Sequence, residues 1–127
     1  MTKTVLVVED EQSLNKAITM KLEKKGYKVF SVMTAEEAIP ILEKENIDFI
    51  WLDILLPGMT GLEFLGIIRK KPLLKDKRVA IVSVSGSFGT KETAMQLGAV
   101  DYIVKSEYKL DDIIERVATE INGEQKQ

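Results

Sequence analysis

The chain has 127 residues, of which 45% are hydrophobic, and its net charge is −2 with charges of both signs along its length. This length fits one domain, and the mixed charges provide no basic footprint for nucleic acid. Cys and His are both absent, which excludes disulfides, thiolate and imidazole metal sites and a histidine phosphoacceptor in this chain. No apolar run approaches the roughly 18 residues of a membrane span, so we expect a cytoplasmic protein.

Short apolar runs alternate with longer helical patterns, which is typical of a parallel sheet flanked by helices. Strands are predicted at 4–8, 27–32, 48–53, 79–84 and 102–104. Helices are predicted from 14 to a stop at Gly26, from an N-cap at Thr34, at 61–70, at about 90–97 and at 110–121. Pro40 lies inside the second helix, where its ring would clash with a backbone carbonyl, so we expect a kink or a shortened helix.

Charged side chains lie at the downstream ends of three of the predicted strands. Glu9 and Asp10 follow the first, Asp53 ends the third and Lys105 follows the fifth. Because ligands bind beyond the carboxyl ends of parallel strands, we expect these groups at one crevice. Oxygen-only ligands select Mg²⁺, which favours one or two carboxylates, waters and a phosphate oxygen. The sequence therefore predicts a site for a hard cation and a phosphate.

Each of these residues also has a purely structural interpretation. Asp10 or Ser13 would serve as a cap for the first helix, a role that can coexist with metal binding. Asp53 would simply end a strand, and Lys105 would be a solvated surface residue. However, Asp53 lies between apolar runs, and an isolated buried carboxylate is costly unless it is paired. Beside Mg²⁺ and Lys105 it would stay ionised and could act as a nucleophile that forms an aspartyl-phosphate.

A serine is expected to complete this crevice. Ser85 is predicted to end the fourth strand, where its hydroxyl would donate to a phosphoryl oxygen on Asp53. Gly86, the next residue, would leave room for the phosphoryl group.

With these motifs the chain resembles the receiver domain of two-component response regulators over about residues 3–121. The resemblance rests on Glu9-Asp10, on residues 53–61, on Ser85-Gly86 and on residues 98–105, in this order along the chain. It implies a flavodoxin-like, doubly wound α/β fold, with a five-stranded parallel sheet of order 2-1-3-4-5 and five helices. A receiver domain would occupy residues 1–122 and a polar tail 123–127.

The resemblance also implies how the site is used. Asp53 would accept a phosphoryl group from a histidine kinase or phosphotransfer protein. Glu9, Asp10, Asp53 and the backbone carbonyl of Leu55 would hold Mg²⁺.

Two further implications concern the phosphoryl group and the output. Lys105 and Ser85 would bind the phosphoryl oxygens, and Tyr102 would move inward as an aromatic switch when Ser85 shifts. The fourth helix, fifth strand and fifth helix would form the surface for a downstream protein target or effector domain. The chain would be a monomer or a phosphorylation-dependent dimer.

The chain departs from the family's commonest pattern near the site. Ser106 replaces the usual proline after Lys105, whose peptide bond is usually cis, so both the cis and the trans form remain open. Leu55 and Ser87, two residues beyond Asp53 and Ser85, offer little help in orienting an attacking water. We therefore expect slow self-dephosphorylation.

Three other functions fit this sequence less well. An aspartate-nucleophile phosphatase would typically have a second Asp where Leu55 stands, together with a cap domain. A flavin-binding protein of this fold is disfavoured by the acidic first loop. A degenerate receiver used only as a binding surface is disfavoured by the intact acids and Lys105. The chain is either a stand-alone receiver or part of a longer regulator, and Met1 and the polar tail favour the former.

Overall fold

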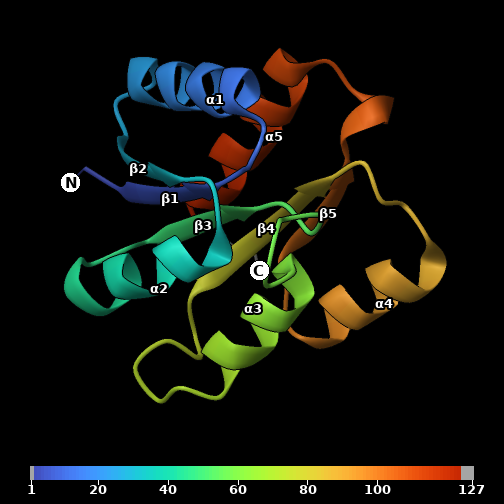
Figure 1. The fold of residues 1–127 in the computed structure, drawn as a ribbon. Coiled ribbons are helices and arrows are strands. Elements are labelled where there is room, and N and C mark those ends of the chain that lie inside the picture. The colour runs from blue at the N-terminus through green and yellow to red at the C-terminus, as the bar shows by residue number, and fades with distance from the viewer. Residues whose placement is uncertain (1, 124–127) are drawn as a thin grey trace.

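Five parallel strands lie between two layers of helices in the computed structural model, which describes residues 2–123 (Figure 1). The strands are β1 (Thr4–Val8), β2 (Lys28–Val32), β3 (Phe49–Leu52), β4 (Arg78–Ser83) and β5 (Asp101–Val104). They form one sheet in the order β2-β1-β3-β4-β5, with every neighbouring pair parallel. The predicted fold class and strand order are thus confirmed. Except for Gly123, the predicted tail at 123–127 lies outside the described residues.

The helices cover both faces of this sheet. They are α1 (Gln12–Lys24), α2 (Ala35–Lys44), α3 (Gly61–Arg69), α4 (Phe88–Gln96) and α5 (Leu110–Ile121), with a 3₁₀-helix, η1 (Lys105–Glu107), after β5. α1 and α5 lie on one face, and α2, α3 and α4 lie on the other (Figure 1). None of the described helices is long and apolar enough to cross a membrane.

The inner strands β1, β3 and β4 are mostly apolar and buried because both of their faces are covered. Alternate residues of each strand belong to two separate apolar layers. The layer with α1 and α5 contains Val5, Val7, Phe49, Trp51, Ala80, Val82 and Ile103. The layer with α2, α3 and α4 contains Leu6, Val8, Ile50, Leu52, Val79, Ile81 and Tyr102. Each central strand is therefore packed on both of its faces. This packing fixes the position of the sheet edge where the polar side chains lie.

Local signals set most helix ends as expected. Gly26, with φ of +97°, follows the end of α1, a conformation that glycine adopts without steric cost. The Thr34 hydroxyl accepts the Glu37 N–H at 3.1 Å and caps α2. α2 continues past Pro40 to Lys44, so the helix is not cut short at the proline.

Two predicted boundaries on either side of the loop between β4 and α4 are wrong. The fourth strand was expected at 79–84 but ends at Ser83, and the fourth helix was expected from Thr90 but begins at Phe88. The helix starts earlier because the Ser87 hydroxyl accepts the Thr90 N–H at 3.3 Å and serves as the N-cap. Residues 85–89 are mostly glycine and serine, a composition that by itself does not indicate a helix start.

Two carboxyl groups meet where α5 packs on the start of β5. Arg116 binds Asp101 through two bonds of 2.7 and 2.6 Å. Glu120 is half-buried, and its Oε1 has no partner among residues 2–123. Burial, and then the neighbouring Asp101 carboxyl, raises the pKa of Glu120 to about 8. Burial alone would raise the pKa of Asp101, but its bonds to Arg116 lower it below 3.8.

As pH rises from 5 to 8, the free energy of unfolding should fall less in Glu120→Gln than in the unaltered chain. A carboxyl whose pKa is raised by folding stabilises the protein below its ordinary value of 4.5, and this contribution is lost as pH rises through about 8. Asp101 is already ionised in this window and contributes nothing to the slope. Urea unfolding at both pH values measures the change, with the exposed Glu92→Gln as the control. Equal pH slopes in the three proteins would contradict the assignment.

Candidate functional site

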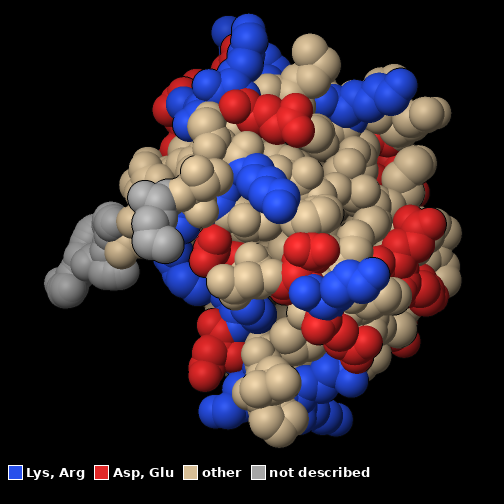
Figure 2. All heavy atoms as spheres, turned by 90° about the vertical axis from the view of Figure 1, so that its left-hand side faces the viewer, with Lys and Arg blue, Asp and Glu red and all other residues tan. Residues whose placement is uncertain are grey.

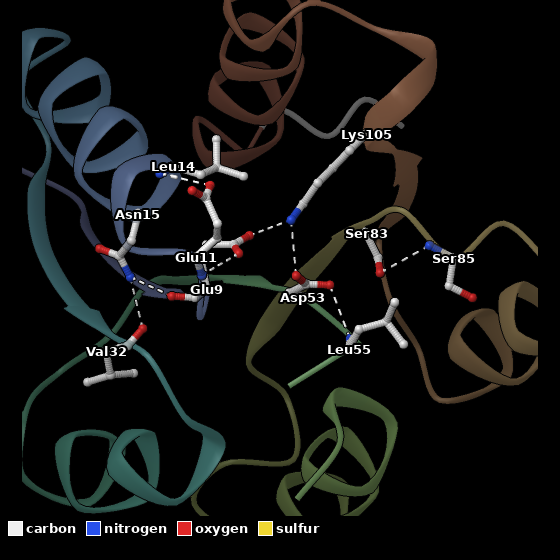
Figure 3. Close-up of polar contacts among 10 residues, drawn as sticks. All are labelled: Glu9, Glu11, Leu14, Asn15, Val32, Asp53, Leu55, Ser83, Ser85 and Lys105. Atoms are coloured by element: carbon white, nitrogen blue, oxygen red, sulfur yellow. Dashed lines mark hydrogen bonds and ion pairs between the residues drawn. The ribbon is translucent and has the colours of Figure 1, made fainter. Parts of the chain in front are cut away.

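Glu9 is the first buried acid at the carboxyl edge of the sheet. It directly follows β1 and is 1% exposed. Its Oε1 accepts the Lys105 ammonium at 2.6 Å, and its Oε2 accepts the Glu11 N–H at 3.0 Å (Figure 3). Both carboxylate oxygens are therefore held in place, which offsets part of the cost of burying the charge.

Asp53 directly follows β3 and is 4% exposed. Its Oδ2 accepts Lys105 Nζ at 3.0 Å and its Oδ1 accepts the Leu55 N–H at 3.2 Å. Lys105, which begins η1 after β5, thus bridges the acids of two other strands (Figure 3). The sequence-based expectation that the ends of β1, β3 and β5 share one crevice agrees with this geometry.

Asp10 completes an acidic cluster with Glu9 and Asp53. One carboxylate oxygen of each lies within 4.8 Å of the others, close to the about 4 Å between opposite ligands of an octahedral Mg²⁺ ion. The donors are all oxygens, as Mg²⁺ prefers, so the residues present fit this ion. The N-cap of α1 is neither Asp10 nor Ser13, as the structural interpretation had it, but Glu11, which accepts the Leu14 N–H at 3.1 Å.

The charges of this cluster are unevenly balanced. Burial raises the pKa of Glu9, even though its bonds to Lys105 and to the Glu11 N–H act in the opposite direction. Burial alone would lower the pKa of Lys105, but the bond to Glu9 and the charge of Asp53 raise it overall. Three acids and one ammonium leave an excess of negative charge, which a bound cation would offset.

The prediction that Ser85 ends the fourth strand is wrong. β4 ends at Ser83, which is completely buried, whereas Ser85 lies in the following loop. β4 pairs with β3, Ile81 with Leu52, so Ser83 ends the strand next to Asp53. The Ser83 hydroxyl accepts the Ser85 N–H at 3.4 Å but donates to no other residue in the described range 2–123. Val84 is as apolar as a strand residue, but it lies beyond the end of β4.

Tyr102 points inward from β5 and is 5% exposed. Its hydroxyl donates to the backbone carbonyl of Ser85 at 2.5 Å, and burial raises its pKa. The ring is thus linked to the loop after β4 through the backbone of Ser85 and not through its hydroxyl.

The peptide bond between Lys105 and Ser106 is trans, since the described residues contain no cis peptide bond. The chain turns at once into η1, which the sequence patterns did not predict. This turn lets Lys105 reach Glu9 and Asp53 without the proline that is usual in the resembled family.

Gly61 allows the loop after Asp53 to fold back tightly. Its N–H donates to the Ile54 carbonyl at 2.9 Å, and a Cβ at this position would lie 2.2 Å from the Asp53 carbonyl oxygen. Only glycine fits such a close approach. Gly61 therefore helps to set the backbone of Asp53.

Asn15 is a site residue that sequence reasoning missed. It is 6% exposed in α1, and its Nδ2 donates to the carbonyls of Glu9 at 2.9 Å and Val32 at 3.0 Å (Figure 3). It thereby ties the acidic turn to the end of β2. The only sequence signal was an amide on the buried side of a helix one turn after the acids.

We expect Asn15→Ala to destabilise the protein by about 2 kcal/mol, because two buried carbonyls lose their donor. The misplaced Glu9 should also weaken Mg²⁺ binding about tenfold, as is usual when a group that orients a ligand is removed. Urea unfolding and the fluorescence of Trp51 under Mg²⁺ titration measure the two effects. The exposed Asn46→Ala is the control. Unchanged Mg²⁺ affinity in Asn15→Ala would limit its role to stability.

Comparisons with known proteins all match this chain to one family. A model of the response regulator receiver domain matches residues 5–118. The transcriptional regulatory protein YvrH of Bacillus subtilis (strain 168) is 34% identical over 103 residues, which make up 80% of this chain and 42% of that protein. The chain therefore spans less than half the length of this curated relative.

Two solved structures are also similar. A CheY-like response regulator receiver domain protein from Methanospirillum hungatei JF-1 shares 27% identity with a TM-score of 0.86, and the match covers 96% of this chain and 95% of that one. TrrA from Thermotoga maritima, solved in complex with Mg²⁺ and BeF, shares 31% identity with a TM-score of 0.79, over 93% of this chain and 98% of that one.

Proposed function

The chain belongs to the receiver domain family of response regulators, and from this premise we propose that it accepts a phosphoryl group on Asp53. The observation that carries the proposal is the buried Asp53 carboxylate, bonded to Lys105 with oxygens of Glu9 and Asp10 close by. A receiver is a signalling domain, so the proposed donor is a histidine kinase or phosphotransfer protein in the cytoplasm.

The proposed transfer is a substitution at phosphorus. An Asp53 carboxylate oxygen attacks the phosphorus of the donor's phosphohistidine, so a P–O bond forms and the P–N bond breaks. The electron pair of the broken bond stays on the imidazole nitrogen, which takes up a proton from solvent. The protein contributes mainly positioning and charge compensation, which dominate catalysis of phosphoryl transfer.

Glu9, Asp10, Asp53 and the backbone carbonyl of Leu55 would hold Mg²⁺, which would offset the charge of the phosphoryl oxygens. Support comes from the acidic cluster of this chain and from the similar TrrA, whose structure contains Mg²⁺ and BeF. Lys105 Nζ is bonded to the Asp53 carboxylate, so it would bind the oxygens of a phosphoryl group on Asp53 as a point charge.

Ser83, and not Ser85, would donate its hydroxyl proton to a phosphoryl oxygen. It ends β4, it is buried, and its proton has no acceptor among residues 2–123. A phosphoryl group adds nearly two charges and three acceptors, so this bond would be charge-assisted.

The proposed output is a change at α4, β5 and α5. Movement of Ser83 toward the phosphoryl group would displace the Ser85 backbone, to which the Tyr102 hydroxyl is bonded. The loop that leads into α4 would then bind a downstream protein target or effector domain in a new conformation. A ligand can shift such an equilibrium only by its differential affinity for the two states.

Slow self-dephosphorylation remains part of the proposal. Leu55, two residues beyond Asp53, is 52% exposed and apolar, so it cannot orient an attacking water by hydrogen bonding. The corresponding position after β4 is Ser85 and not Ser87, which caps α4. A phosphoryl lifetime as short as that of fast-cycling chemotaxis regulators would contradict this part.

Incubation with acetyl phosphate and Mg²⁺, followed by mass spectrometry, tests the function. We expect one labile phosphoryl adduct on Asp53, which is absent in Asp53→Asn and strongly reduced when Mg²⁺ is chelated. An adduct that persists in Asp53→Asn would sink the proposal. Continuous release of phosphate from many esters would instead indicate an aspartate-nucleophile phosphatase.

A further inference from the structure

The molecule has a second surface with features of a binding site, formed by α3 and the loop that follows it. We define this α3 surface by a shallow hollow and by the exposed residues next to it. The hollow is lined by Met59, Leu62, Glu63, Gly66, Ile67 and Lys70. The adjoining loop exposes Leu73 and Lys75 and leaves Lys71 half-buried. We propose that the α3 surface binds an acidic segment of a partner protein that also carries apolar side chains.

Positive charge is concentrated in this loop although the whole chain is slightly acidic. Residues 69–78 contain six of the 18 basic residues and a single acid. Arg69, Lys77 and Arg78 are used internally, because each donates to backbone carbonyls of the fold.

Three lysines of the loop remain for a partner. Lys70 and Lys71 form no ion pair with any of residues 2–123, and Lys75 has only a 3.9 Å contact with Asp76, with both side chains more than half exposed. A concentration of unpaired charge of one sign attracts an oppositely charged partner.

The loop is held in one shape without any partner. Arg69 Nη1 donates to the carbonyls of Lys75 at 3.0 Å and Lys77 at 2.8 Å. Lys77 Nζ donates to the Ile47 carbonyl at 2.8 Å, and Leu74 is buried as an anchor. Such preorganisation lowers the entropy cost of binding. Leu73, next to this anchor, is nevertheless 91% exposed.

The hollow supplies a place for apolar side chains of the partner. Its volume is about 470 Å³, and Met59, Leu62 and Ile67 give it apolar walls. Gly66 keeps it open, since a Cβ there would meet no atom within 4 Å. The hollow runs up to Lys70, so apolar contacts and the free lysines adjoin one another. In Figure 2, Lys and Arg side chains lie on both sides of an uncharged projection at the lower end of the molecule, where this loop lies in Figure 1.

An acidic protein segment fits these features better than an anionic membrane. A concave hollow needs a projecting side chain to fill it, which a bilayer surface does not present. Beyond one exposed leucine the loop offers little to insert, and the net charge of −2 would oppose approach of the rest of the chain to anionic lipid.

A display library of short random peptides, selected on the full chain, tests the proposal. Enriched peptides should combine Asp or Glu with at least one large apolar residue. Their affinity, measured by fluorescence anisotropy, should fall about tenfold or more when Lys70 and Lys71 are both changed to Glu. Gly66→Met should cause a similar loss by filling the hollow, and it should not unfold the protein because methionine favours helix over glycine.

Two controls separate this surface from the proposed phosphoacceptor site. Lys91→Glu, exposed on α4, and Asp53→Asn should bind the selected peptides as tightly as the unaltered chain. The proposal is overturned if no acidic peptide is enriched, or if Gly66→Met and the Lys70/Lys71 variant bind the peptides unchanged. Sedimentation with vesicles of equal parts phosphatidylserine and phosphatidylcholine, abolished by Leu73→Ser, would assign the surface to a membrane and overturn it as well.

Discussion

Replacing Lys105 by methionine should destabilise the metal-free protein by about 3 kcal/mol or more, as is usual when one partner of a buried ion pair is removed. Lys105 Nζ is bonded to both Glu9 and Asp53, whose side chains are 1% and 5% exposed. Without the ammonium, two neighbouring carboxylates would be buried with only single N–H donors from Glu11 and Leu55.

Mg²⁺ should restore much of the lost stability in Lys105→Met. The ion would bind the folded state only, and its affinity should be higher than in the unaltered chain because no ammonium occupies Glu9 Oε1. Trp51 and Lys105 line one cavity of about 220 Å³, so the fluorescence of this sole tryptophan can report the binding.

Urea unfolding with and without Mg²⁺ measures this rescue, and the exposed Lys91→Met serves as the matched control. The pKa of Lys105 is raised, so its stabilising contribution is complete below 10.5 and is lost only as pH rises through its higher value in the folded protein. The difference between Lys105→Met and the unaltered chain should therefore persist from pH 7 to pH 10. Destabilisation no larger than in the control, or one that Mg²⁺ leaves untouched, would refute the assignment.

Ser83→Ala should slow the formation of the phosphoryl adduct, whereas Ser85→Ala should leave it nearly unchanged. A hydrogen bond to a charged group contributes about 1.5–3 kcal/mol, which corresponds to a loss of about ten- to a hundredfold in rate for Ser83→Ala. Ser85 is the matched control because its described hydrogen bonds come from its backbone N–H and carbonyl, which alanine retains.

The rate of adduct formation with acetyl phosphate and Mg²⁺ distinguishes the two serines. Ser83→Ala should be as stable as the unaltered chain, because its hydroxyl accepts only one bond of 3.4 Å. A slower rate in Ser85→Ala than in Ser83→Ala would return the phosphoryl-binding role to Ser85, as the sequence had first indicated.

The fold and the acids of the site were predictable because they depend on patterns of near neighbours along the chain. Fully apolar runs such as Thr4–Val8 indicate strands covered on both faces, and charges directly after such runs must lie at the carboxyl edge. Glu9, Asp53 and Lys105 therefore came together as expected, with bonds of 2.6 and 3.0 Å.

The end of β4 and the role of Asn15 could not be read in the same way. Val84 is as apolar as a strand residue but is 57% exposed, because pairing with β5 stops at Ser83 and Val104. Asn15 looks like an ordinary polar helix residue until β2 brings the Val32 carbonyl to within 3.0 Å of it. In both cases the outcome depends on a contact with a residue far away in the sequence.

The sequence by itself determined the parallel sheet, the chemistry of its acidic edge and the family, since periodicity and residue type need no knowledge of distant contacts. Only the tertiary structure decided which serine lies beside Asp53, that the bond after Lys105 is trans, and that Asn15 holds the acidic turn. The physical reason is that strand pairing and side-chain reach depend on groups far apart in the chain, whose positions are set only once the two apolar layers have packed.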